Sequence, residues 1–161
     1  MNNDYVILEK YATLKYKMSD IVQRGFKHMQ DGQLKKGART IRHEDETMEA
    51  PPGGRIAILQ KRRGYRFSID ALLLAGFIRL KAGTHTAELG SGSGVISFLL
   101  AERYRRTMIQ GFDIQEELVE MARRSAFLNN LADRVEFTCL DIRHIQSQGA
   151  PRSVDAVFFN P

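Results

Sequence analysis

The chain has 161 residues, of which 43% are hydrophobic, and a formal net charge of +5. This length allows one domain with a buried core, and this composition argues against a disordered chain. A single cysteine, Cys139, excludes an internal disulfide and favours a reducing compartment, so we expect a cytoplasmic protein. The longest apolar run, residues 71–78, is too short to span a bilayer, so we expect no membrane partner. The first residues also lack the layout of a signal peptide.

Residues 5–30 carry apolar side chains at steps of three and four, which predicts an amphipathic helix that ends at Asp31-Gly32. Its apolar stripe must pack against the domain or against a second copy, so self-association through this helix is one expectation. Between Lys10 and Arg42 nine basic residues face two acidic ones, a local charge of +7. Such an arm suits a polyanion such as RNA, and an ordinary solvated helix face explains it equally well.

Residues 33–54 read as a linker, because charges are mixed, apolar residues are few and Pro51-Pro-Gly-Gly54 interrupts the chain. We therefore divide the chain into a helical extension with linker at 1–50 and a domain at 51–161. In the domain we predict short strands at 55–60 and 65–67, and a helix through 71–78 that Ser68 or Asp70 caps.

Strands and helices alternate after this first helix. The predicted strands are 86–89, 108–113, 134–140 and 154–159, and the predicted helices are 94–104 and 115–128. Alternation with connections of this length predicts an α/β fold with a parallel sheet and right-handed crossovers. In such sheets, ligands bind beyond the carboxyl ends of the strands.

The segment Glu88-Leu-Gly-Ser-Gly-Ser-Gly94 links the first of these strands to its helix. Its glycines remove side chains at the turn, so a ligand can approach the backbone there. The spacing Gly-x-Gly-x-Gly differs from the Gly-x-Gly-x-x-Gly of dinucleotide enzymes, which disfavours a dehydrogenase. Glycines also serve tight turns that bind nothing, so this pattern alone is weak evidence.

Two acids at later strand ends strengthen the interpretation as a nucleoside site. Asp113 ends the second strand, where a carboxylate can accept hydrogen bonds from both hydroxyls of a ribose. It can also simply cap the helix that follows. Asp141 closes the third strand and can accept from the amine of an adenine, or it can be an ordinary loop acid.

The fourth apolar strand delivers Asn160-Pro161 at its end. This pair matches the start of an Asn-Pro-Pro-Tyr motif, in which carbonyl oxygens hold a planar amine and expose its nitrogen to a methyl donor. An Asn-Pro pair is also a common turn, and only its place beside the other strand ends favours chemistry.

Four segments, residues 64–75, 88–94, 111–115 and 155–161, resemble the bacterial valine-tRNA adenine-N6 methyltransferases. The resemblance covers residues 55–161. It implies a Rossmann-like class I methyltransferase fold whose first four parallel strands have the order 3-2-1-4. It also implies S-adenosylmethionine as cofactor and tRNA as substrate.

The resemblance assigns roles to individual residues. Around the methionine part of the cofactor it places Glu88, Gly90, Ser91, Gly92 and Gly94. It places Asp113 at the ribose, Ile114 and Ile142 on the two sides of the adenine, and Asp141 at the adenine amine. Phe67 and Ser68 would close over the donor carboxylate, and Asn160 and Pro161 would belong to the catalytic loop.

The chain differs from this family in two ways. Residues 1–50 have no recognised counterpart, and the sequence stops at Pro161, inside the catalytic motif. We therefore expect a fragment with impaired turnover, in which the fourth strand is an apolar edge open to self-association.

Two other functions stay open at this point. One is a protein-glutamine methyltransferase or another enzyme with the Asn-Pro-Pro-Tyr motif, and the other is a non-catalytic module that binds S-adenosylmethionine or associates with partners. Metal chemistry is disfavoured because the four histidines stand singly, without ligand spacing. We expect Cys139 and Phe127 to be packed in the core, and Arg124 to be an ordinary exposed helix residue.

Overall fold

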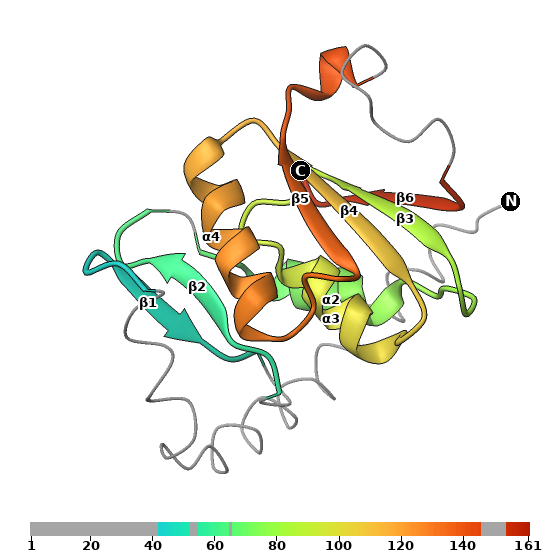
Figure 1. Ribbon diagram of the computed structural model, residues 1–161, viewed down its shortest axis with the longest axis horizontal. Helices are drawn as coiled ribbons and strands as arrows, with labels where there is room; N and C mark the ends of the chain where they lie inside the picture. Colours follow the sequence, from blue (N-terminus) through green and yellow to red (C-terminus); the bar gives the residue numbers. More distant parts are fainter. Residues whose placement is uncertain (1–41, 52–54, 65, 146–153) are drawn as a thin grey trace, which may run out of the picture.

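The computed structural model describes residues 42–51, 55–64, 66–145 and 154–161, and the predicted helix at 5–30 lies outside them. Figure 1 shows the arrangement of the elements. In chain order these are β1 (Glu46–Glu49), β2 (Ile58–Lys61), α2 (Ile69–Phe77), β3 (His85–Leu89), α3 (Val95–Arg103), β4 (Met108–Asp113), α4 (Glu116–Leu128), β5 (Val135–Cys139), the 3-10 helix η1 (Ile142–His144) and β6 (Ala156–Phe159).

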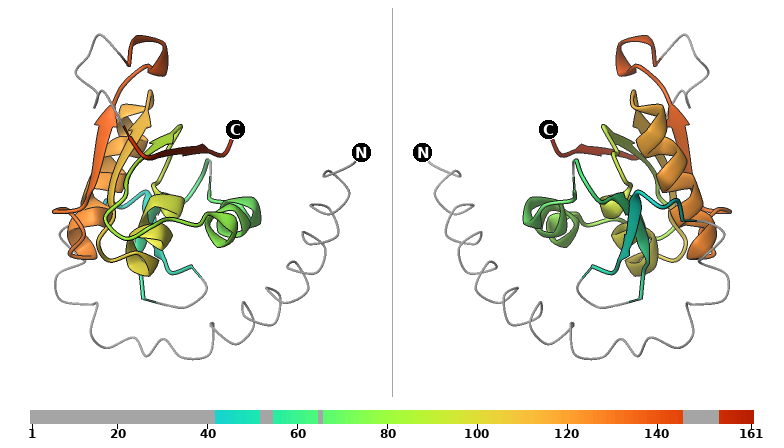
Figure 2. Two further views of the ribbon diagram at one scale, coloured as in Figure 1. Left: turned by 90° about the vertical axis from the view of Figure 1, so that its right-hand side faces the viewer. Right: turned by 90° about the vertical axis from the view of Figure 1, so that its left-hand side faces the viewer.

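The central sheet has four parallel strands in the order β5-β4-β3-β6. This order is the predicted 3-2-1-4, because β3 is the first strand of the alternating part, and the predicted α/β class is confirmed. Glu88 of β3 lies opposite both Gly111 of β4 and Phe158 of β6, so β3 is central and its carboxyl end is flanked on both sides. Both views of Figure 2 show α2 and α3 on the same side of β6.

The main core lies between this sheet and the helices. Alternate strand residues, among them Ile109, Val135 and Phe137, point toward α3 and α4 and are almost fully buried. The rings of Phe98 and Phe137 meet with centroids 5.4 Å apart. Burial of each such ring contributes about 2–3 kcal/mol. A smaller apolar cluster of Ala87, Phe112 and Leu140 occupies the other face.

A β-hairpin stands beside α4, on the side away from the central sheet (Figure 1). It pairs β1 with β2 in antiparallel register, with Glu46 opposite Lys61. The linker predicted at residues 33–54 therefore contains a strand, which its mixed charges concealed. The strand predicted at 65–67 is wrong for Arg66 and Phe67, which have irregular backbone; the Phe67 N–H donates to the side chain of Gln60 over 2.9 Å.

Two polar side chains of the α4 region bind the backbone beside and within β2. The Asn129 amide accepts from the Ala57 N–H at 2.8 Å and donates to the Ala57 carbonyl at 2.7 Å. The Ser125 hydroxyl accepts from the Leu59 N–H at 3.0 Å. These side chains make the hydrogen bonds that a neighbouring strand would otherwise make, because buried backbone N–H and C=O groups need hydrogen-bond partners.

A buried ion pair joins the hairpin to α4. Both carboxylate oxygens of Glu46, a residue with no exposed surface, lie 2.7 Å from guanidinium nitrogens of Arg124. Burial by itself would raise the pKa of Glu46, but the hydrogen bonds from Arg124 and from the His43 N–H bring this pKa below its ordinary value. The side chain of Arg124 therefore belongs to a buried ion pair, and the prediction that Arg124 is an ordinary exposed helix residue is wrong.

We expect Arg124→Met to lower the free energy of unfolding by about 3 kcal/mol, because it leaves the Glu46 charge buried without its main partner. Denaturant unfolding followed by circular dichroism measures the loss. The double variant Glu46→Leu with Arg124→Met is the control, since it removes both charges and should recover most of the stability. Equal losses in the single and double variants would contradict this account of the pair.

Two further expectations about packing are wrong. Phe127 is 67% exposed, because it falls outside the stripe of α4 that Val119, Ala122 and Ala126 bury. Cys139 is exposed at the end of β5, where its sulfur lies 3.6 Å from the Ile114 carbonyl oxygen.

Strand β6 lies at the edge of the central sheet, with Val157 and Phe159 more than half exposed. Self-association through this strand stays a prediction. Among the described residues, no helix has the length and apolar character needed to cross a membrane.

Candidate functional site

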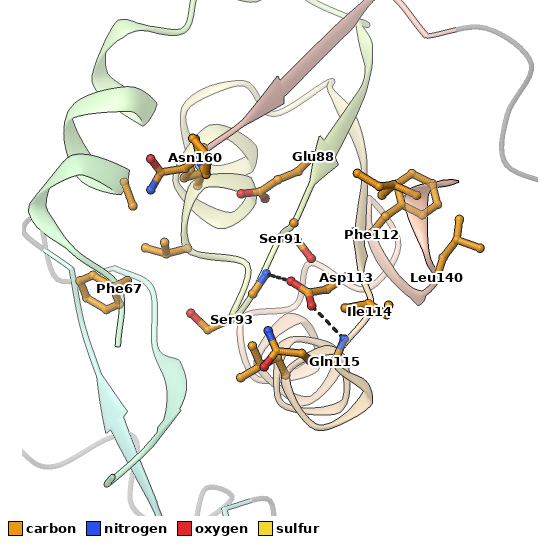
Figure 3. Close-up of a pocket in the computed structure, with 18 of the residues that line it drawn as sticks. Phe67, Glu88, Ser91, Ser93, Phe112, Asp113, Ile114, Gln115, Leu140 and Asn160 are labelled. Atoms are coloured by element: carbon orange, nitrogen blue, oxygen red, sulfur yellow. Dashed lines mark hydrogen bonds between the residues drawn. The ribbon is translucent and has the colours of Figure 1, made fainter. Parts of the chain in front are cut away.

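A cavity of about 640 Å³ opens at the carboxyl ends of the central strands (Figure 3). This is the edge of the sheet at which ligands of open α/β folds bind. It brings together most of the residues predicted for the site. The predicted residues that line it are Phe67, Glu88, Gly90, Ser91, Gly92, Asp113, Ile114, Asp141, Ile142, Asn160 and Pro161.

The glycine turn between β3 and α3 has positive φ at all three glycines, 66° at Gly90, 53° at Gly92 and 78° at Gly94. L-residues with a side chain rarely adopt such angles. A Cβ on Gly90 would meet nothing within 4 Å, so the cavity side of the turn is open. A Cβ on Gly94 would lie 2.4 Å from the Phe137 ring, so this third glycine makes room for the core. Gly94 does not line the cavity.

Asp113 ties the glycine turn to the start of α4. One carboxylate oxygen accepts from the Gly92 N–H at 2.7 Å and the other from the Gln115 N–H at 2.9 Å. Asp113 therefore both stabilises the local turns and lines the cavity. Asp113 is 6% exposed, and each oxygen keeps a lone pair for a further donor.

Glu88 is a buried carboxyl inside the cavity wall. It accepts from the backbone N–H of Ser97 at 3.2 Å and from the Ser97 hydroxyl. The pKa of Glu88 is raised to about 8, chiefly by burial and to a smaller extent by the nearby charge of Asp113, while the two hydrogen bonds from Ser97 act in the opposite direction. Glu88 is therefore largely protonated at neutral pH.

At the other end of the cavity two apolar side chains face solvent. Ile114 is 62% exposed and Ile142 is 47% exposed. Ile114 follows the carboxyl end of β4, and Ile142 begins η1 just after β5, the strand that neighbours β4. A flat apolar ring bound here would bury both side chains, which stabilises such a complex.

Asp141 beside them is engaged by a neighbour that the sequence did not point to. The Nε of Arg143 lies 3.0 and 2.9 Å from its two carboxylate oxygens. Hydrogen bonds from the Arg143 side chain and backbone lower the pKa of Asp141 to about 2. Asp141 is thus a fixed negative charge, and Arg143 shares the cavity lining with it.

Phe67 and Asn160 lie on the opposite side of the cavity from Phe112 and Leu140 (Figure 3). Ser68 is the N-cap of α2 but makes no capping hydrogen bond through its side chain, and it does not line the cavity. The sequence interpretation missed several lining residues. They are Ala71, Ser93, Val95, Ile96, Phe112, Gln115, Leu118, Leu140 and Arg143. Most of them lie within a few residues of a predicted site residue in the sequence, and this closeness is the feature from which they could have been predicted.

One group of possible metal ligands occurs in the described ranges, His43, Asp45 and Glu46, and none of these three residues lines the cavity. Its carboxylates already have cationic partners. Glu46 binds Arg124, and Asp45 lies 2.6 Å from the Lys61 ammonium. These side-chain cations compete with any metal ion for the same oxygens.

Residues 80–161 match a family model described as a methyltransferase domain. The chain is 27% identical over 104 residues to a tRNA1(Val) (adenine(37)-N6)-methyltransferase of Phocaeicola vulgatus, which covers 65% of this chain and 43% of that protein. It is 32% identical over 75 residues to a ubiquinone biosynthesis O-methyltransferase of Neisseria meningitidis, which covers 47% of this chain and 30% of that protein. It thus spans less than half the length of these curated relatives.

A crystal structure of a SAM-dependent methyltransferase from Agrobacterium tumefaciens has a similar fold. The TM-score is 0.54 at 14% identity, over 74% of this chain and 40% of that one, which supports the fold alone. The family match covers half of the chain, including every strand of the central sheet. The chain therefore belongs to the methyltransferase domain family.

Proposed function

We propose that this chain carries the S-adenosylmethionine site of a methyltransferase that modifies N6 of an adenine in tRNA. The observation that carries the proposal is the convergence of Glu88, Asp113 and Asp141 on one cavity from three different strand ends, with Asn160 at the same cavity. Residues this far apart in the sequence meet there because parallel strands end at one edge.

The nucleoside half of the cofactor fits one end of the cavity. Ile114 and Ile142 offer apolar surface to an adenine, and Asp141 offers a carboxylate to its amine. The free lone pairs of Asp113 suit the two hydroxyls of a ribose, because its present bonds use one position on each oxygen. This donor set fits a nucleoside without any metal ion.

The amino-acid half fits the other end. Gly90 leaves the backbone open and Gly92 lines the cavity beside it, and Ser91 and Glu88 supply polar side chains. Phe67, at the wall formed by the segment before α2, is placed to cover this end and exclude water. When bound, S-adenosylmethionine supplies an electrophilic methyl group.

Asn160 is the proposed acceptor-binding residue. It follows β6, the neighbour of β3, and lines the same cavity as Glu88. Its side-chain oxygen and the backbone carbonyls beside Pro161 are acceptors for an exocyclic amine. Holding the amine through acceptors orients its nitrogen toward the donor, and such positioning lowers the barrier to transfer.

The tRNA substrate is supported by the curated relatives, several of which are named as tRNA1(Val) (adenine(37)-N6)-methyltransferases. The basic segment Lys10–Arg42 adds a charge that suits phosphates. A small-molecule O-methyltransferase is the second candidate, because the Neisseria relative has that name and the higher identity. The Asn-Pro pair favours a planar amine over a hydroxyl.

We expect Asn160→Ala to lower methyl transfer about 100-fold and to change the cofactor Kd by less than about threefold, because the side chain contacts the acceptor and not the donor. The measurement is tritium transfer from S-adenosylmethionine to bulk tRNA over hours, with nucleoside analysis of the product. Glu136→Gln, a change at an exposed position of β5, is the matched control. Label in a glutamine-containing protein or a phenol, and none in tRNA, would reject the tRNA assignment.

A further inference from the structure

Arginines gather at the edge of the molecule that lies opposite the cavity. Basic and acidic side chains are equal in number in the described ranges, so this gathering does not reflect an overall excess of positive charge. The edge is formed by the amino ends of the central strands and the C-terminal ends of α2 and α3, because the parallel strands have their carboxyl ends at the cavity. Its arginines are Arg55, Arg79, Arg103, Arg105, Arg106 and Arg134, and its acids are Glu102, Asp133, Glu136 and Asp155.

Two of these arginines have a structural role. Arg103 donates to a carbonyl oxygen near the end of α2 over 2.7 Å, and Arg134 donates to a carbonyl oxygen of α3 over 3.2 Å. Cations stabilise the C-terminal end of a helix, where carbonyl groups lack partners within the helix. Because a carbonyl group has no net charge, each guanidinium is held in place and keeps its positive charge.

The helix ends do not account for Arg105 and Arg106. These residues are exposed in the turn between α3 and β4, beyond the last helical residue. Neither has an ion-pair partner among the described acids, so their guanidinium groups keep donors for a ligand. An ordinary solvated turn would also hold two such arginines, so the case for a ligand depends on the surface around them.

A hollow of about 350 Å³ supplies this evidence. It brings together Arg55, Arg105 and Arg134, which are far apart in the sequence. The acid in its lining is Glu102, whose carboxylate lies 3.7 Å from the Nε of Arg55. Three guanidinium groups thus meet one carboxylate, and the hollow is positively charged. The planar fork of a guanidinium matches the oxygens of a phosphate group, which favours a phosphate ligand.

We propose that this basic edge, defined by Arg55, Arg105, Arg106 and Arg134, binds phosphate groups of an RNA backbone. None of the exposed large apolar side chains lines the hollow, whereas an interface with an acidic protein has an apolar centre. Contacts to phosphates carry no sequence information, so the edge holds and orients RNA without selecting a base.

The identity of this RNA as the tRNA substrate rests on the proposed function. Strands of five and six residues separate the basic edge from the cavity, a distance of roughly 20 Å. An RNA that contacts both edges must therefore extend well beyond its target nucleotide, as a folded tRNA does. The basic edge then adds affinity for the substrate without touching the reacting atoms.

Fluorescence anisotropy of labelled bulk tRNA, titrated with the full chain between about 50 and about 200 mM KCl, tests the proposal. Arg55→Gln combined with Arg105→Gln removes two exposed cations from the hollow. We expect the tRNA Kd to rise about tenfold, and the slope of log affinity against log salt to become shallower by about 2. The loss should be the same with polyuridylate, because phosphates and not bases are bound. Thermal unfolding confirms that the variant is folded.

Arg62→Gln combined with Arg63→Gln is the matched control. It changes the net charge equally, at exposed positions that follow Lys61, which pairs with Glu117 on the cavity side of α4. Its tRNA Kd should change less than about twofold. Arg55→Lys combined with Arg105→Lys keeps both charges and should recover most of the affinity. The basic segment Lys10–Arg42 is present in every variant, so it contributes equally to all of them.

Equal losses in the two glutamine double variants would show an effect of net charge alone and would overturn the proposal. Polyglutamate is the probe for an acidic protein: if it binds as tightly as tRNA and loses affinity in the same variant, the assignment to RNA is wrong. Calorimetry with S-adenosylmethionine separates this inference from the proposed function. Its Kd should be equal in wild type and in the Arg55 and Arg105 variant. A wild type that binds no S-adenosylmethionine would reject the proposed function, and the RNA measurement would still decide the role of the basic edge.

Discussion

Gly94→Ala should lower the free energy of unfolding by about 3 kcal/mol or more, whereas Gly90→Ala should lower it by about 1 kcal/mol. Both glycines have positive φ, so both substitutions strain the backbone. Only at Gly94 would the new methyl group also collide with the buried Phe137 ring, at 2.4 Å. Chemical denaturation of the two variants measures the difference.

A second substitution tests whether the ring causes the larger loss. In a Phe137→Leu background the clash partner is smaller, so Gly94→Ala should cost clearly less than it does alone. If the two glycine variants lose equal stability, or if the Phe137 background changes nothing, backbone strain accounts for the whole effect and the packing role of Gly94 is wrong.

Asp113→Ala should weaken S-adenosylmethionine binding about 100-fold. Two hydrogen bonds from a ribose to a charged acceptor contribute together on the order of 3 kcal/mol. The variant also deprives the Gly92 and Gln115 N–H groups of their acceptor, so the glycine turn loses its anchor to β4. We therefore expect a lower melting temperature as well. Calorimetry and thermal unfolding read these two effects separately.

Asp133→Asn is the matched control, since Asp133 is an exposed acid in the loop before β5 and does not line the cavity. Its affinity and stability should equal those of wild type. Adding adenine, which has no ribose, distinguishes the roles further: its weaker binding should be nearly the same in wild type and Asp113→Ala. Unchanged cofactor affinity in Asp113→Ala would remove the ribose assignment.

The sequence predicted the features that depend on local pattern. Apolar runs that alternate with helical patterns predicted the four parallel strands, and the family resemblance supplied their order, which the structure has. The cavity followed from the same reasoning, because residues at strand ends such as Glu88 and Asp113 must meet at one edge. For these residues, the topology of the sheet is enough to predict that they lie close together.

Other features depend on contacts between residues that are distant in the chain, or on side-chain rotamers, and a local sequence pattern does not predict them. The strand β1 lies in a charged segment and is held by Arg124, 78 residues away. Gly94 sits among the ligand-facing glycines but serves Phe137, from a later strand. Arg143 turns back onto Asp141, and this local ion pair changes the charge that the cavity presents.

The Asn129 and Ser125 contacts to the backbone at Ala57 and Leu59 have a consequence for aggregation. An incoming polypeptide that tried to extend the hairpin along this margin would find those amide and carbonyl groups already engaged. The α4 region thus blocks β-strand addition at Ala57 and Leu59. Another polypeptide therefore cannot add a strand to the hairpin on the side of β2 that faces α4.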